Sequence, residues 1–383
     1  MVENSVRHLA APATNLIVSY VVISATSPEL WGRFAVDLIV VGLGVHFLAW
    51  GNKEYLLRAM SAEDGSVASL WQSSLLSRSL GVPLVILAMA VFGIDGDVLI
   101  WLAGWIALAF LYQSLDVVVL FGHRFRLAIG AEALGLATTV GLLLVRGADL
   151  DEGAVVAAWV SGVLVKTMVL FIGLAPTLCR ERLGRLELRQ FREALPFVLL
   201  GLSGLLHSRI DLYAMALLAS SDDMGRYQVT IGLYIAFQAV AAFVLMPFVR
   251  ELYESSDDHS HAAAGRLAAG GIGIAVLSVP VAWLLLNRIY GFDFGWQVFA
   301  IGALMVMPVY RFAPRIYLLY KHHGERTVIA VNFAGAAVNL VLAVFLIPRW
   351  SIIGALGAAA ISQWFILACY EIVVRRRSRT AGV

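Results

Sequence analysis

HSRIDLYAMALLASSDDMGRY, residues 207 to 227, is the stretch on which the interpretation of this chain depends. Its first part places Arg209 and Asp211 inside an apolar segment, 191–219, that is long enough to cross a bilayer. A charged side chain at membrane depth is costly unless it faces protein or water, so residues of this kind are usually functional. We therefore expect this segment to line a polar site within a membrane.

The second part of the same stretch repeats an earlier one. SPELWGRF at 27–34 and SSDDMGRY at 220–227 each combine a turn with Gly, Arg and an aromatic residue, and their glycines match at an offset of 193. Residues 126–139 and 326–339 form a weaker second match at an offset of 200. Both offsets are about half of the 383 residues, which predicts two similar halves.

The composition excludes an ordinary soluble domain. The chain is 60% hydrophobic and 14% charged, whereas soluble domains carry about 25% charged residues. In lipid, an apolar segment satisfies its own backbone hydrogen bonds by forming a helix. Twelve spans are expected, at 9–26, 33–50, 72–92, 98–120, 126–146, 153–175, 191–219, 227–249, 264–287, 295–318, 327–347 and 352–374. We predict an all-α, polytopic membrane protein whose first span is an uncleaved helix rather than a signal peptide.

The distribution of basic residues predicts the orientation. Of the 28 Lys and Arg residues, 18 fall in loops on one side of the membrane, five in loops on the other side and five within spans. Because cytoplasmic loops carry the excess of Lys and Arg, both termini are expected in the cytoplasm. The longest basic segment, CRERLGRLELRQFRE at 179–193, spaces leucines among five arginines. That pattern is typical of an amphipathic connector on the inner leaflet, although a solvated linker explains it equally well.

This connector divides the chain into an N-terminal half, 1–178, and a C-terminal half, 194–383, with six predicted spans each. Because six is an even number, the two halves keep the same orientation in the membrane. We therefore expect a parallel pseudo-two-fold axis along the membrane normal. Substrate sites of transporters built in this way lie near the midplane between the halves.

Four short motifs of the second half follow one another in a recognisable order. They are ALPF at 194–197, RID at 209–211, a turn that ends in Gly225 and Tyr227, and Pro247. In this order they resemble the seventh and eighth spans of the polysaccharide flippases (Wzx-like), a family of the multidrug/oligosaccharidyl-lipid/polysaccharide (MOP) exporter superfamily. The resemblance extends loosely over the whole chain, and each motif is short. The sequence departs from the family pattern in a turn that begins with SSDD instead of Gly-Pro, in a first span that lacks the start its repeat partner has, and in the absence of a basic residue near the outer end of that span.

The resemblance implies a V-shaped transporter of two six-helix bundles with a central cavity. Such a protein flips a lipid-linked saccharide, of the polyprenyl pyrophosphate type, across the cell inner membrane as its halves rock. The partners implied are this substrate and membrane lipid, with no cofactor, no catalysed reaction and a functional monomer. A pyrophosphate needs fixed cations, and Arg binds phosphate through paired hydrogen bonds whereas Lys acts as a point charge.

Cations and polar groups within the spans are therefore the candidates for substrate binding. Arg209 is the best placed, and Asp211, two residues later, points to a different face and cannot simply pair with it. Each of the two could instead bind another span and lock two helices together. Lys166, in the middle of the sixth span, is either a cavity cation or the partner of a distant acid such as Asp37. The remaining candidates are His207, Arg311 and Arg315. Snorkelling to the inner headgroups explains the last of these equally well.

Other in-span charges favour structural roles. Arg78 and Asp116 lie toward the cytoplasmic ends of adjacent antiparallel spans, which favours a structural ion pair. Glu132 could accept a proton during transport, but we favour its pairing with Arg124 or Arg126 in the same segment.

Competing classes of function find less support. No metal site is expected, because the acids and histidines of DDHSH at 257–261 lack ligand spacing and we interpret them as a solvated inner loop. Nothing indicates nucleic-acid binding. A drug or metabolite antiporter of the same superfamily is the nearest alternative, but it would favour carboxylates over the Arg and Lys that dominate the spans. A membrane-embedded glycan polymerase or ligase would need a large outer loop, and the outer loops here are short.

Overall fold

The computed structural model describes residues 2–62, 66–91, 96–179, 184–245, 257–322 and 324–381. These ranges contain ten helices that are long and apolar enough to cross a membrane. The all-α, multi-pass membrane fold is thereby confirmed, while the count of twelve spans and the pseudo-two-fold axis stay predictions. Residues 180–183 of the predicted connector, and residues 246–249 of the predicted eighth span with Pro247, lie outside the described part.

The helices of the first half follow the predicted spans closely. They are α1 (Val2–Ala25), α2 (Pro28–Ala49), α3 (Asn52–Ser61), α4 (Val67–Ser79), α5 (Val82–Val91), α6 (Gly96–Phe121), α7 (Phe125–Arg146) and α8 (Glu152–Leu178), with a 3-10 turn η1 (Gly147–Asp149) before α8. The short helix α3 replaces part of a predicted inner loop. It forms because Asn52, Leu56 and Met60, one turn apart, are all buried along one face.

The predicted third span is two helices rather than one. Helix α4 ends at Ser79 and α5 begins at Val82, with the amide of Gly81 donating to the Arg78 carbonyl at 2.9 Å. Pro83, in the first turn of α5, has no amide hydrogen to donate and its ring crowds the preceding turn, which favours a break before it.

The helices of the second half are α9 (Arg189–Leu218), α10 (Ser221–Leu245), α12 (Asp257–Trp283), a π-helical turn η3 (Leu284–Ile289), α13 (Trp296–Lys321) and α14 (Glu325–Ala381). Helix α12 begins at Asp257, so DDHSH lies on the first turns of a helix and the loop predicted there is wrong.

Helix α14, 57 residues long, folds back on itself at Ser351, whose backbone leaves the helical region at φ 42° and ψ −120°. The Ser362 hydroxyl donates to the Gly335 carbonyl at 2.8 Å, and the Tyr370 hydroxyl reaches Asn332 at 3.3 Å. Residues 38 positions apart on a straight helix would be separated by about 57 Å. The two arms of α14 are therefore antiparallel, as the predicted spans 327–347 and 352–374 require.

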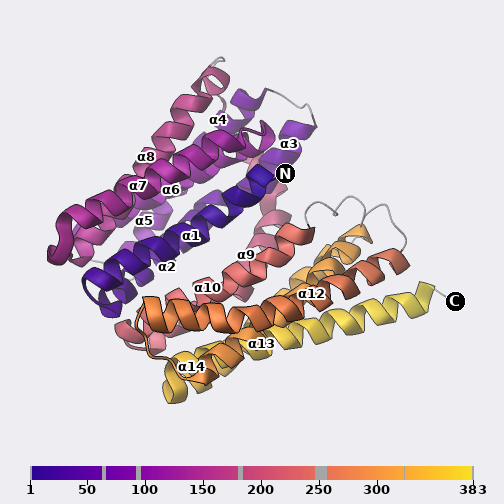
Figure 1. The fold of residues 1–383 in the computed structure, drawn as a ribbon. Coiled ribbons are helices and arrows are strands. Elements are labelled where there is room, and N and C mark those ends of the chain that lie inside the picture. The colour runs from indigo at the N-terminus through magenta and orange to yellow at the C-terminus, as the bar shows by residue number, and fades with distance from the viewer. Residues whose placement is uncertain are drawn as a thin grey trace. The chain divides into compact units, whose positions relative to one another are not determined.

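The described chain forms two compact units, one of residues 15–33 and 203–383 and the other of residues 2–14 and 34–202. In the first unit, α12, α13 and α14 pack in sequence with α10 against them (Figure 1). In the second unit, α7 packs on α8 and both contact α6, while α3 and α4 lie against α6 (Figure 1). Leu56, Trp71, Leu115, Leu170 and Leu174 lie at the core of this second unit.

Candidate substrate site

Helix α9 carries one face of polar side chains at helical spacing. Ser203, His207 and Asp211 are four residues apart and therefore share that face. The Ser203 hydroxyl lies 3.5 Å from the Asn332 amide, His207 Nε2 lies 3.5 Å from the Gln363 amide, and Asp211 accepts a hydrogen bond from the Tyr227 hydroxyl. Interhelical hydrogen bonds of this kind hold membrane helices together. The face ties α9 to α14 and α10.

Arg209 lies on a different face of α9. At 100° per residue it is about 200° around the helix from His207. It precedes the end of α9 at Leu218 by nine residues, about 14 Å of helix, which places it at membrane depth. The side chain is half-buried and forms no hydrogen bond or ion pair with another residue that the structure describes. Asp211, in contrast, is 2% exposed and already bonded.

Arg311 and Arg315 of α13 converge on one acid of α14. Glu371 Oε1 lies 2.8 Å from Arg311 Nε and also contacts the Arg315 guanidinium, while Arg375 Nε is 4.0 Å from the other oxygen. The predicted pair of arginines is therefore brought together, but around an acid of the chain itself. Glu371 was not predicted as a site residue, although it is an acid inside the last apolar segment and lies one turn before Arg375.

Lys166 belongs to a closed cluster in the other unit. Its ammonium lies 3.3 Å from Glu132 Oε2 of α7 and 4.2 Å from the centre of the Tyr112 ring of α6. The Tyr112 hydroxyl donates a hydrogen bond to the same carboxylate. Gly135 allows the close approach, because a side chain there would press on the Gly162 carbonyl and the base of Lys166. The acid that pairs with Lys166 is therefore Glu132, and not Asp37 as suggested from the sequence.

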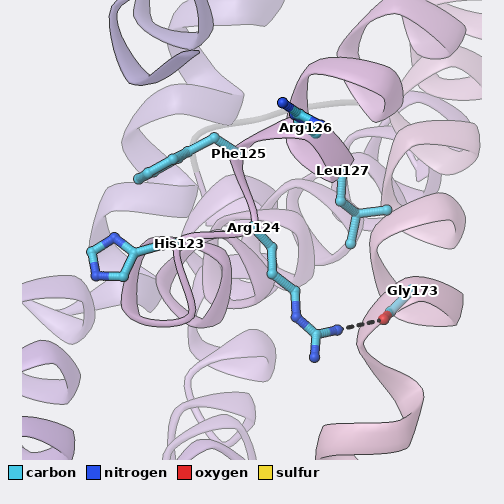
Figure 2. A pocket seen from close by; sticks show the side chains of 6 residues that line it. All are labelled: His123, Arg124, Phe125, Arg126, Leu127 and Gly173. Carbon is cyan, nitrogen blue, oxygen red and sulfur yellow. Dashed lines mark hydrogen bonds between the residues drawn. The ribbon is translucent and has the colours of Figure 1, made fainter. Parts of the chain in front are cut away.

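The expected pairing of Glu132 with Arg124 or Arg126 is therefore wrong. Arg124 instead ties the loop between α6 and α7 to α8, donating to the Gly173 carbonyl at 3.0 Å (Figure 2) and to the Thr177 hydroxyl at 3.3 Å. The loop bears a hollow of about 540 Å³, with His123 and Arg126 also at its edge. Glu132 lies at least one turn further along α7, nearer the membrane interior, where α8 supplies the closer cation.

Arg78 has partners other than the predicted Asp116. Its side chain is 1% exposed and donates to the Ala49 carbonyl at 2.9 Å, the Ser74 hydroxyl at 2.6 Å and the Gln190 amide oxygen at 3.3 Å. The carbonyl at the C-terminal end of α2 carries part of the helix dipole, which favours a cation there. This guanidinium stabilises the junction of α2, α4 and α9. Asp116 makes its contacts elsewhere.

The two copies of the sequence repeat pack against each other at the beginnings of α2 and α10. A side chain added at Gly32 would overlap the Ser221 carbonyl, and one added at Gly225 would overlap the Pro28 carbonyl. The contact is reciprocal, since each glycine meets the residue four positions before its counterpart. Beside it the Trp31 indole donates to Gln228 at 2.7 Å. Glycine is required here because two backbones touch.

No group of three His, Cys, Asp or Glu side chains converges as metal ligands would within the described ranges. The polar groups within the spans are instead largely cationic side chains. Arg209 presents an open guanidinium, and three further in-span cations are held by carboxylates.

Comparison with known proteins supports the fold. No protein-family model and no curated protein matches the sequence. The chain is similar to a solved structure of the lipid II flippase MurJ in an inward closed conformation, with a TM-score of 0.72, 12% identity and 98% of this chain and 88% of that chain covered. It is also similar to an inward-facing multidrug-resistance MATE transporter of the MOP superfamily, with a TM-score of 0.62, 14% identity and coverages of 97% and 94%. A Vibrio cholerae MATE transporter matches at a TM-score of 0.58, 14% identity and coverages of 98% and 95%. The chain thus has the fold of MOP transporters.

Proposed function

We propose that this protein flips a lipid-linked oligosaccharide or polysaccharide precursor across the cell inner membrane by alternating access. Both termini are cytoplasmic and the protein works as a monomer in this proposal. The likeness in fold to a lipid II flippase over nearly the whole chain supports it. A saccharide carried on polyprenyl pyrophosphate is the substrate, because its phosphates need a cation at membrane depth.

The observation that best supports the proposal is that the Arg209 guanidinium has no hydrogen-bond acceptor among the described residues. The other four cations predicted within spans have acceptors: Ala49, Ser74 and Gln190 for Arg78, Glu132 for Lys166, and Glu371 for Arg311 and Arg315. Arg209 has no such acceptor among the described residues. Asp211, two residues away, attracts this charge electrostatically but forms no bond with it, so in this proposal an anion or water also solvates the guanidinium during function. A pyrophosphate, bound through the two parallel N–H groups of the guanidinium, meets this requirement.

The glycine contact between α2 and α10 supplies the proposed outer gate. In the proposed orientation both helices begin at the outer surface, where this contact lies. In the proposed mechanism the contact separates when the protein opens outward. A contact made by backbone surfaces and one indole hydrogen bond can part without stranding a buried charge.

Replacement of Arg209 by Ala tests the proposal in cells that depend on this protein for surface glycan. We expect export to fall at least tenfold while the amount of protein in the membrane stays normal. Arg349→Ala is the matched control, because that exposed arginine donates to its own helix at the Phe345 carbonyl. Normal export by Arg209→Ala would exclude the site, and loss of the protein itself would assign Arg209 a structural role.

A drug or metabolite antiporter is the second candidate, which the likeness to MATE transporters favours. It predicts the opposite pattern in the same cells. Deletion of the protein would then sensitise cells to organic cations and leave surface glycan unchanged.

A further inference from the structure

A cavity of about 800 Å³ opens between the short helix α3 and the first turns of α9. Its walls are held by direct contacts. The Trp50 indole, at the turn between α2 and α3, donates to the Phe191 carbonyl of α9 at 3.2 Å. Gly51, with φ 66°, lies so close to Ala194 and Phe197 that a side chain there would press on both. The hollow is therefore part of a packed junction.

The acids around this cavity already have partners. Glu193 Oε1 lies 2.6 Å from Arg189 Nε, and Glu187 accepts a hydrogen bond from the Gln190 amide at 3.1 Å. Both acids line the cavity, the Glu193 charge paired with Arg189 and the Glu187 carboxylate hydrogen-bonded to a neutral amide.

Two arginines of the same cavity have no such partner. Arg58 comes from α3 and Arg192 from α9, both are exposed, and neither side chain forms a hydrogen bond or ion pair with another described residue. The cavity lining thus carries three arginines against two acids, and the two guanidinium groups outside the pair of Arg189 and Glu193 give it a net positive charge. Such groups bind phosphate oxygens in pairs of parallel hydrogen bonds.

The remaining surface of the junction is apolar. Leu70, Pro196 and Phe197 line the cavity. Leu186 and Leu188, just before α9, are 46% and 61% exposed, although apolar side chains of this size usually avoid water. A surface that combines paired arginines with exposed leucines is suited to the boundary between headgroups and acyl chains.

We propose that Arg58 and Arg192 bind the phosphate headgroup of an anionic phospholipid of the inner leaflet in this cavity. The leaflet follows from the proposed cytoplasmic placement of the basic loops, and basic pockets on that side of membrane proteins hold such headgroups. The site is distinct from the proposed substrate site, because Arg192 precedes Arg209 by 17 residues, about 26 Å of helix. By holding α3 to α9, the lipid stabilises the junction that Arg78 also stabilises from within.

The test is a titration of the detergent-purified full chain, followed by its unfolding temperature. The probes are a short-chain phosphatidylglycerol, a phosphatidylcholine of equal chain length, and inorganic phosphate. We expect phosphatidylglycerol to stabilise the wild-type protein at concentrations at least tenfold lower than either other probe. The double variant Arg58→Ala/Arg192→Ala should lose this preference, and Arg58→Lys/Arg192→Lys should keep part of it because the charge remains.

Arg124→Ala/Arg126→Ala is the matched control, since it removes the same charge from another predicted inner loop (Figure 2). It should keep the preference for phosphatidylglycerol. If the control lost the preference for phosphatidylglycerol to the same extent, the preference would come from general surface charge and the proposal would be overturned. An unchanged preference in the Arg58→Ala/Arg192→Ala variant would overturn it as well, and equal stabilisation by inorganic phosphate would exclude a lipid. Transport plays no part in the measurement, so its outcome is independent of the proposed substrate.

Discussion

The hydroxyl of Tyr227 donates to Asp211, which is enclosed between α9 and α10 and 2% exposed. An acid in this position cannot reach water, so its oxygen depends on the tyrosine. The same face of α9 bonds α14 through His207. Asp211 and His207 are therefore helix-to-helix ties in the proposed account, while Arg209 remains open to a ligand.

Tyr227→Phe tests this division at the level of one hydroxyl. It leaves a buried carboxyl oxygen without its donor, and we expect a loss of about 1–3 kcal/mol in the free energy of unfolding. The measurement is a denaturant titration of the purified chain, followed by tryptophan fluorescence. Tyr213→Phe on α9 is the control, because the Tyr213 hydroxyl makes no hydrogen bond with the described residues. Equal stability of the two variants would contradict the tie.

The depth of each charge could be predicted from the sequence, but its partner could not. Arg209 lies where the apolar segment 191–219 placed it. Lys166 and Glu132 are 34 residues apart and Arg311 and Glu371 are 60 apart, so their pairing depends on which helices become neighbours. Spacing along one helix reports only which face a residue occupies. The prediction for Glu132 failed because it took basic residues of the same segment, and the prediction for Arg78 failed because it paired it with the acid at the matching end of an adjacent span.

Helices α2 and α10 meet through Gly32 and Gly225, and this contact explains why the two copies of the repeat share a glycine. The motif also contains a turn, an arginine and an aromatic residue. The sequence alone does not show which of these features causes the motif to occur twice. The overlap that a side chain would cause at either glycine identifies close backbone packing as the constraint.

Gly32→Val and Gly225→Val should force the first turns of α2 and α10 apart. Spin labels at Ser27 and Ser220, in a chain with Cys179 and Cys369 replaced by Ser, report the separation by pulsed electron paramagnetic resonance. We expect a longer distance in both valine variants. Gly42→Val and Gly232→Val are the controls on the same two helices, because nothing lies within 4 Å of a side chain added there. An unchanged distance in folded Gly32→Val and Gly225→Val would exclude the gate.

The positions of the long helices were predictable because hydrophobic length is nearly sufficient to define a membrane span. The details that failed are set by single residues or by burial. Pro83 divides the third span, and burial of Leu56 and Met60 turns a loop into α3. The reversal of α14 at Ser351 was anticipated by the charge and polarity between two apolar runs.

The molecule as a whole combines the fold of MOP transporters with a cationic set of in-span residues. Three helices, α1, α2 and α9, each contain a boundary between the two compact units, so the described chain passes from one unit to the other within helices. The division of the chain at 179–193 remains a prediction. In the proposed account this molecule moves a pyrophosphate-linked saccharide, and Arg209 engages it.

Reconstitution into liposomes tests that claim most directly. A polyprenyl pyrophosphate oligosaccharide is placed in both leaflets, and the fraction accessible to an external glycosidase is followed with time. We predict that the wild-type protein and Arg349→Ala expose the protected inner-leaflet fraction and that Arg209→Ala does so at least tenfold more slowly. A wild-type protein that leaves this fraction protected, while it transports organic cations in the same vesicles, would contradict the account.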